Sequence, residues 1–347
     1  MNPLSLTLIS ITLITGTMIT IVSSNWMLMW MGLELNMLAM IPLMNINTNY
    51  RSTEAATKYF LVQSTASMLF MLAILNNLKV SGQWNMFNMQ DDITNYILLV
   101  SLAMKLGLVP FHLWVPEVTQ GIPLMPGLIM LTWQKLAPMA IIYQLSPYLN
   151  VNLMMTMALA SILIGGWGGL NQIQLRKIMA YSSIAHMGWM MAATIYNPSA
   201  MLFNLLIYIM LTITMFISLN YLTMMTTSSL ASTWNSHPLI TLTLLITLLS
   251  LGGLPPLTGF LPKWYIIQEL VLNNMTMPAL LMAMMALLNL FFYVRLIYST
   301  SMTMFPMTNP NKLKWSIMPQ KKLMMVPTLL VISSLSMPLA PLIYSIL

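Results

Sequence analysis

The sequence predicts an all-α protein that crosses a membrane many times. Of its 347 residues, 58% are hydrophobic and only 5% are charged, whereas a typical soluble domain has about 25% charged residues. The mean hydropathy is +0.80, and apolar runs of about 20 residues, long enough to cross a bilayer as a helix, recur along the chain. The polar segments between these runs are too short to form a soluble catalytic domain. We therefore expect any nucleotide, flavin or iron–sulfur cluster to lie in another chain.

The apolar runs predict about eleven crossings. A run such as 93–120 would be about 42 Å long as one straight helix, against a hydrocarbon core of about 30 Å. The run 238–271 is longer still, so we expect a break in each of these two segments. The expected spans are 3–22, 26–44, 53–78, 93–120, 124–146, 150–171, 177–196, 200–221, 238–271, 276–298 and 324–345.

Glycine and proline clusters mark the two expected breaks. Gly107 and Pro110 interrupt the first long run, and the segment from Gly252 to Gly259 interrupts the second. Proline removes a backbone donor and glycine relaxes the backbone, so both residues weaken a helix. The segments LGLVPFHLWVPE and LGGLPPLTGFLPKW also resemble each other as a weak internal repeat. Paired interruptions of this kind indicate a transporter-like site near the middle of the bilayer.

The basic residues indicate a topology when each broken helix is counted as one crossing. One side of the membrane then holds nine of them and the other side holds only Lys79, whereas counting each broken helix twice gives seven against three. Because Lys and Arg collect in the loops that are not translocated, we expect the amino terminus on the basic side and the carboxyl terminus opposite. The nine residues are Arg51, Lys58, Arg176, Lys177, Arg295, Lys312, Lys314, Lys321 and Lys322.

Residue usage excludes several kinds of site and indicates a compartment. The chain has no cysteine, so it offers no thiolate for a zinc or iron–sulfur site. The first basic residue is Arg51, so no signal or transit peptide pattern opens the sequence. The 40 methionines fit a mitochondrial genetic code. The basic residues form no patch with interleaved aromatic residues, so we expect no nucleic acid partner.

Three lysines lie inside apolar runs, where a charged side chain is costly. Placing Lys105, Lys135 or Lys263 at the centre of a bilayer costs about 3 kcal/mol each. Burial disfavours the ammonium form, so such a lysine can both take up and release a proton. The alternatives are a permanent structural ion pair or a side chain that reaches the membrane surface. The second alternative is disfavoured because the lysines lie near the middle of their helices.

One acid and two histidines complete the set of candidate residues. Glu34 lies deep in the second run and is the expected counter-charge of Lys105 or Lys135. Moving this carboxylate away would favour proton release from the lysine, although a static buried pair is the alternative. His112 and His186 can donate at one ring nitrogen and accept at the other, as a proton relay requires. The alternative for each is a histidine in the core whose ring nitrogens have hydrogen-bond partners and which has no role in proton transfer.

Two further kinds of acid lie nearer the ends of the helices. Glu54 falls in the first turn of its predicted helix, where the helix dipole favours negative charge, so we expect it at the membrane interface. Glu117 and Glu269 lie in the later halves of the two broken helices. A role at the end of a proton channel and a plain interfacial position both remain open for them, and the second is favoured.

The motifs KLGLVPFHLWVPE, LTWQKLAP and LPPLTGFLPKW closely resemble the antiporter-like membrane subunits of respiratory NADH–ubiquinone oxidoreductase (complex I). This family is shared with multi-subunit cation/proton antiporters, and the resemblance covers essentially the whole chain. It implies two inverted repeats with one broken helix each, at about 26–146 and 150–271, followed by C-terminal helices in 276–347. It also implies that the three N-terminal helices of the wider family are lacking, because Glu34 already lies on the second span.

The resemblance also implies roles for particular residues. Glu34 and Lys105 correspond to the charge pair of the first half, Lys135 to the central lysine and Lys263 to the lysine of the second broken helix. His112 and His186 match the polar axis of the family less closely. Together these residues are expected to carry protons, without metal or cofactor in this chain.

The function that the resemblance implies is proton translocation coupled to NADH oxidation and ubiquinone reduction in the mitochondrial inner membrane of a mammal. NADH, FMN, iron–sulfur clusters and ubiquinone are then expected in partner subunits. The expected partners are other membrane-arm and accessory subunits of complex I and membrane lipids. The amino terminus is expected in the matrix and the carboxyl terminus in the intermembrane space. Two alternatives remain: a stand-alone cation/proton antiporter, and a scaffold subunit without a proton path of its own.

Overall fold

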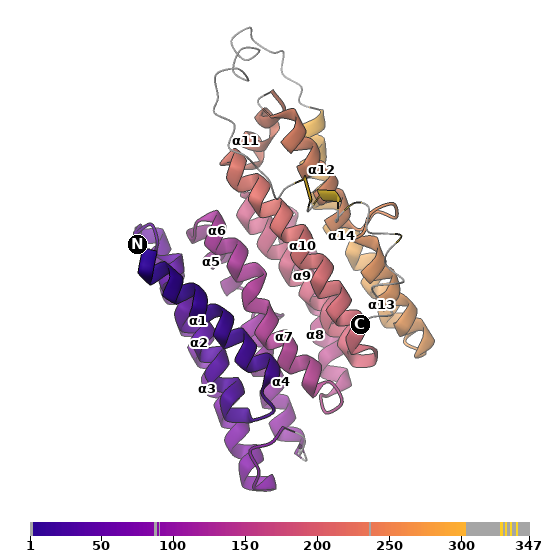
Figure 1. Ribbon diagram of the computed structural model, residues 1–347. Coiled ribbons are helices and arrows are strands. Elements are labelled where there is room, and N and C mark those ends of the chain that lie inside the picture. Colours follow the sequence, from indigo (N-terminus) through magenta and orange to yellow (C-terminus); the bar gives the residue numbers. More distant parts are fainter. Residues whose placement is uncertain are drawn as a thin grey trace. The chain divides into compact units, whose positions relative to one another are not determined.

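The computed structural model describes residues 3–86, 89, 91–235, 237–302, 327–328, 330–331, 334 and 338. Within these ranges the chain is helical, and its β-structure is limited to two isolated bridges. The described helices and their order are drawn in Figure 1. The span expected at 324–345 falls outside the continuously described ranges, as do Lys312, Lys314, Lys321 and Lys322. The predicted all-α fold is confirmed for the described part of the chain.

The chain divides into two compact units, and each is described by itself. The first contains Met1–Ser161 and Met191–Pro198, and the second contains Ile162–Met190 and Ser199–Leu347. Two helices, α8 (Val151–Gly169) and α9 (Leu175–Tyr196), continue from one unit into the other.

The first unit is built from seven further helices. The helices α1, α2 and α3 lie side by side (Figure 1). Glycines allow α1 and α2 to approach closely, since a Cβ on Gly16 would lie 2.6 Å from Oδ1 of Asn36. These helices are α1 (Pro3–Val22), α2 (Trp26–Met44), α3 (Tyr50–Ser81), α4 (Asp92–Leu106), α5 (Trp114–Gly121), α6 (Leu124–Leu131) and α7 (Trp133–Leu145).

The second unit contains α12 packed beside α14 (Figure 1). The guanidinium of Arg295, on α14, donates to the backbone oxygen of Leu170 and, at 2.7 Å, to that of Gln172. Both residues follow the end of α8, so Arg295 gives a donor to two backbone oxygens of the segment that leaves this helix. The elements are α10 (Pro198–Leu222), α11 (Thr227–Ala231), the 3₁₀ helix η1 (Ser232–Asn235), α12 (Pro238–Gly252), α13 (Phe260–Leu272) and α14 (Thr276–Ser301).

We expect Arg295→Met to destabilise the second unit by about 1–2 kcal/mol, because two half-buried carbonyl oxygens lose their donor. Arg295→Lys should lose less, since an ammonium can reach one of the two oxygens. The midpoint temperature of thermal unfolding, measured on the purified membrane assembly that contains the chain, gives the change in stability. Equal stability of the two variants would show that the two hydrogen bonds from the guanidinium do not stabilise the unit more than one bond does.

Both predicted breaks are confirmed. The helix α4 ends at Leu106 and α5 begins at Trp114, while α12 ends at Gly252 and α13 begins at Phe260. Each first half is followed by a glycine in the left-handed region, Gly107 at φ +72° and Gly253 at φ +82°. A glycine at this position closes a helix at little conformational cost. The sequence therefore places both breaks correctly.

Two features of the helices were not predicted. The expected span 124–146 is interrupted at Thr132, between α6 and α7, and the polar segment 222–237 contains α11 and η1. The hydroxyl of Thr132 donates to the backbone oxygen of Leu128 at 2.7 Å, a local bond that competes with the helical pattern.

Seven described helical segments are long and apolar enough to cross a membrane, with α6 and α7 counted as one. The halves of the broken helices are individually too short to count, so the total of about eleven crossings stays a prediction. Several apolar side chains of α1 point away from the unit, including Leu4, Leu8 and Val22, which are 78%, 63% and 81% exposed. An apolar face of this kind is typical of contact with lipid or with another membrane subunit.

Candidate functional site

The first break is capped by a buried lysine from another helix. Lys135, on α7, is 3% exposed, and its Nζ donates to the backbone oxygen of Leu106. Leu106 is the last residue of α4, so its carbonyl belongs to those that a helix leaves without a backbone partner. The carbonyl end of a helix also carries partial negative charge. The ammonium therefore lies where the broken helix favours a cation.

Lys105 is the penultimate residue of α4 and is also buried. Its backbone oxygen accepts a 3.5 Å hydrogen bond from Nε2 of Gln63 on α3. Glu34, on α2, lies near Lys105, yet no ion pair within 4.0 Å joins them in the described part of the chain. The predicted charge pair therefore consists of electrostatic neighbours rather than residues in direct contact.

A small cavity lies between the two lysines of the first unit. It offers about 20 Å³ to a water-sized molecule, and one water needs roughly 10–15 Å³ measured in this way. The cavity is therefore large enough for one water molecule beside the two lysines. Its lining includes Lys105, Lys135, Asn36, Gln63, Gln134 and Tyr59.

Three amide side chains line this cavity and were not predicted from the sequence as candidate site residues. Nε2 of Gln134 donates to the backbone oxygen of Asn36 at 3.3 Å, and Gln63 contacts the carbonyl of Lys105 as described above. Neither side-chain amide atom of Asn36 has a hydrogen-bond partner among the described residues. Amides inside apolar helices are a signal for a polar interior, because burying them without partners is costly.

The second break is capped by its own lysine. Lys263 lies in the first turn of α13 and is 8% exposed. Its Nζ donates to the backbone oxygens of Leu251 at 3.2 Å and Gly252 at 2.9 Å. These residues end α12, so the ammonium again lies at the carbonyl end of a broken helix. The side chain passes over Gly253, where a Cβ would lie 2.7 Å from Nζ.

His186 belongs to the same group as Lys263. The imidazole, on α9, lies near the carbonyl of Leu251 and near the ammonium of Lys263. The oxygen of Leu251, which accepts from Lys263, is therefore near both side chains. The ring also packs against Tyr208, with ring centroids 5.3 Å apart. Tyr208 is buried and is not among the residues that the sequence singled out.

His112 is placed differently from the other candidates. Its Nδ1 lies 3.3 Å from the backbone oxygen of Pro110, within the first break, and it is not among the residues that line the cavity. Its described hydrogen bond is thus local. The structure brings Lys105 and Lys135 to one cavity in the first unit, whereas Glu34 lies near Lys105 but does not line that cavity. In the second unit His186 lies near Lys263.

The described ranges hold no group of three or more His, Cys, Asp or Glu residues that could bind a metal ion. Lysine and histidine side chains can both accept and release protons. The chemistry that this arrangement supports is therefore proton transfer, at two groups that each include the carbonyl end of a broken helix.

Two families match the chain. The family described as NADH:quinone oxidoreductase/Mrp antiporter, transmembrane, matches residues 23–289, and the family described as NADH dehydrogenase subunit 2 C-terminus matches residues 290–344. NADH-ubiquinone oxidoreductase chain 2 of Dasypus novemcinctus is 61% identical over 98% of both chains. The protein of the same name from Equus asinus is 59% identical over 99% of both.

Solved structures show the same fold. A chain of respiratory complex I from Thermus thermophilus has a TM-score of 0.85 and 25% identity, over 97% of this chain and 79% of that one. A chain of the Mrp complex from Dietzia has a TM-score of 0.79 and 17% identity, over 86% of this chain and 61% of that one. The resemblance expected from the sequence motifs is confirmed. The chain belongs to the antiporter-like membrane subunits of NADH:quinone oxidoreductase, and among them to the chain 2 type found in mammals.

Proposed function

We propose that this chain is a membrane-arm subunit of respiratory complex I and translocates protons while other subunits oxidise NADH and reduce ubiquinone. The relatives named NADH-ubiquinone oxidoreductase chain 2 support the assignment to complex I. One structural observation carries the proposal of proton transfer. Two buried lysines, Lys135 and Lys263, each donate to the free carbonyl end of a broken helix.

In the proposed mechanism the lysines take up protons from one side of the membrane and release them to the other. The carbonyl end of a helix stabilises the ammonium, and burial opposes it, so the two forms of the side chain are close in free energy. A change in the charge or position of Glu34 then shifts Lys105 between these forms. Lys135, His186 and Lys263 complete the proposed relay, and His112 is assigned a lesser part at the first break.

The energy required is within reach of such a device. Moving one charge against about 150 mV requires roughly 3.5 kcal/mol. When a carboxylate approaches a buried lysine or moves away from it, the free energy of protonating that lysine changes by a similar amount. A modest rearrangement around Glu34 and Lys105 therefore suffices to drive one transfer.

The wider setting is part of the same proposal. NADH, FMN, iron–sulfur clusters and ubiquinone are assigned to partner subunits, and the other neighbours are membrane-arm and accessory subunits and lipids. The chain is assigned to the mitochondrial inner membrane, with its amino terminus in the matrix and its carboxyl terminus in the intermembrane space. The proposed repeats are 26–146 and 150–271, with C-terminal helices in 276–347.

A stand-alone cation/proton antiporter is the second candidate, favoured by the family description that includes Mrp antiporters. Purification decides between the two candidates. An antiporter exchanges cations for protons when the chain alone is reconstituted in liposomes, whereas a complex I subunit requires its redox partners. Cation exchange by the isolated chain would therefore contradict the first proposal.

Neutralising the proposed charge pair tests the relay in the assembled complex. We expect Glu34→Gln and Lys105→Met each to lower NADH-driven proton translocation about tenfold, equivalent to about 1.4 kcal/mol. The double variant should lose less than the product of the two effects, because neighbouring charges act together. Proton uptake by inner-membrane vesicles, normalised to the amount of assembled complex, measures these rates.

The matched control is Asp92→Asn, which neutralises an exposed acid in the first turn of α4. It should leave translocation unchanged. Coupled turnover that survives loss of both Glu34 and Lys105 would favour the scaffold alternative over the relay.

A further inference from the structure

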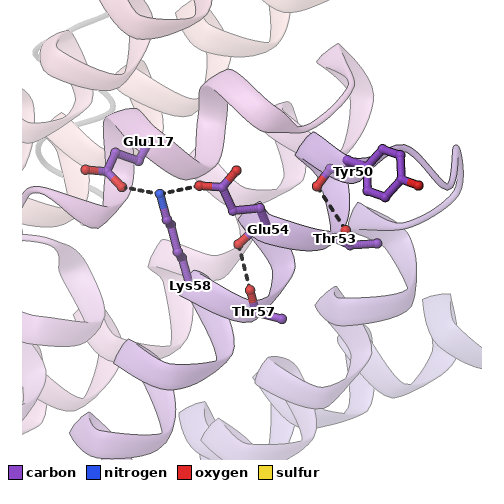
Figure 2. Close-up of polar contacts among 6 residues, drawn as sticks. All are labelled: Tyr50, Thr53, Glu54, Thr57, Lys58 and Glu117. Carbon is purple, nitrogen blue, oxygen red and sulfur yellow. Dashed lines mark hydrogen bonds and ion pairs between the residues drawn. The ribbon is translucent and has the colours of Figure 1, made fainter.

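A charged cluster joins α3 to the second half of the first broken helix (Figure 2). Nζ of Lys58 lies 2.7 Å from Oε1 of Glu54, one turn earlier on α3, and 2.8 Å from Oε2 of Glu117 on α5. The three side chains are 42%, 63% and 54% exposed, so the cluster is reached by solvent. Its position differs from that of the buried lysines, and the relay proposed above does not use it.

The contact between α3 and α5 continues on both sides of this cluster. At one end, a Cβ on Gly121 would lie 2.6 Å from the backbone oxygen of Arg51 and 2.7 Å from Cβ of Ala55. At the other end, the rings of Tyr59 and Trp114 are 5.9 Å apart. The contacting residues of α5 are spaced three or four apart, so they share one face of the helix. The helix α5 is therefore seated on α3 along its length.

Trp114 connects the contact between α3 and α5 to the candidate functional site. Its Nε1 donates to the backbone oxygen of Met104 at 3.2 Å, next to Lys105 in the last turn of α4. Tyr59 and Trp114 also line the cavity that contains Lys105 and Lys135. A change in the position of α5 thus acts on the carbonyl end of α4 and on the surroundings of both lysines.

The chemistry of the cluster suits a contact that opens and closes. Exposed ion pairs are weak, and each changes a conformational population by about two- to fivefold. When the bond to Glu117 breaks, Lys58 keeps Glu54 as its partner on the same helix, so opening leaves no ammonium without a carboxylate. Glu54 thereby lowers the cost of releasing α5.

We propose that Lys58 and Glu117 form a latch that seats α5 on α3 and so positions Trp114 against the end of α4 beside Lys105. Both are positioning residues, since neither touches the cavity lysines. The effect on proton translocation rests on the proposed function, whereas the effect on α5 does not. Closing the latch holds the break in the arrangement seen here, and opening it frees the second half of the broken helix.

Hydrogen–deuterium exchange of the intact complex tests the latch directly. We expect the amides of Trp114–Gly121 to exchange about two- to fivefold faster in Lys58→Gln and in Glu117→Gln. The double variant should resemble each single variant, because all three lack the same bond. Unchanged exchange in both single variants would overturn the proposal.

Glu54→Gln is the matched control, since it removes a carboxylate from the same lysine without touching α5. Exchange in α5 should be no faster than in the unsubstituted protein, because without Glu54 an open latch would leave the ammonium of Lys58 without a carboxylate. If Glu54→Gln speeds exchange as much as Glu117→Gln does, the charge of the cluster rather than the bond between the helices is the cause, and the latch is wrong.

The pH profile of proton translocation tests the positioning of Lys105. We expect Lys58→Gln and Glu117→Gln to lower translocation about two- to fivefold and to shift its pH dependence, while the amount of assembled complex is unchanged. Faster exchange in α5 with an unaltered rate and pH profile would overturn the link from the latch to Lys105. A failure of the relay itself is recognised separately, because it would leave translocation intact in Lys135→Met.

Discussion

Complex carrying Lys135→Met is expected to assemble and to lose about tenfold or more of its NADH-driven proton translocation. Methionine matches lysine in length but cannot hold a proton. The oxygen of Leu106 loses its donor, which costs about 1–3 kcal/mol. Removing a buried ammonium from the apolar interior offsets that cost. Protons translocated per NADH oxidised, measured in inner-membrane vesicles, give the effect on coupling.

Two further variants separate proton transfer from simple capping of the helix. Lys79→Met makes the same change at an exposed residue at the end of α3 and should leave translocation unchanged. Lys135→Arg keeps a cation that can cap the carbonyl of Leu106, but a guanidinium does not release its proton. Translocation should therefore stay low in Lys135→Arg. Full activity of that variant would mean that the residue is a static cap.

The sequence predicted those parts of the fold that depend on local chemistry. The spans 3–22 and 26–44 coincide with α1 and α2, and the glycine and proline clusters placed both breaks. The interruption at Thr132 was not predicted, because a threonine inside an apolar run usually stays helical. Its hydroxyl bonds to the carbonyl of Leu128 here, and only the packed structure shows that this local bond is made.

The candidate site was predicted residue by residue but not as an arrangement. The cost of burying a charge identified Lys105, Lys135 and Lys263, since that cost depends on the surrounding run of apolar residues. The partner of each lysine could not be predicted in this way. Lys135 reaches a carbonyl 29 residues earlier in the chain, and His186 lies near the oxygen of Leu251 that accepts from Lys263.

The predicted partner of Lys105 shows the same limit. A lone acid among lysines suggests an ion pair, yet Glu34 and Lys105 form no ion pair within 4.0 Å in the described ranges. The amides of Gln63 and Gln134 line the cavity beside Lys105 and bond to backbone oxygens. Polar residues of this kind carry no charge, so their burial costs less and their signal in the sequence is weaker.

The second large effect is expected at Gly253, which combines a left-handed backbone with close contact to Lys263. In Gly253→Ala the new Cβ would lie 2.7 Å from Nζ and 3.0 Å from Cδ of Lys263. The side chain is flexible, so it should move and leave the oxygens of Leu251 and Gly252. We expect at least a fivefold loss of proton translocation, beyond the roughly 1 kcal/mol that a left-handed alanine costs in stability.

Gly82→Ala provides the matched control for backbone strain. Gly82 closes α3 at φ +67° and has no neighbouring atom within 4 Å of a built Cβ, so its alanine variant carries the strain without the contact. It should lose stability but keep translocation. On a Lys263→Met background, Gly253→Ala should add little further loss of translocation, because the ammonium it displaces is already absent. If the two substitutions instead multiply their effects, Gly253 acts on translocation by a route that does not pass through Lys263.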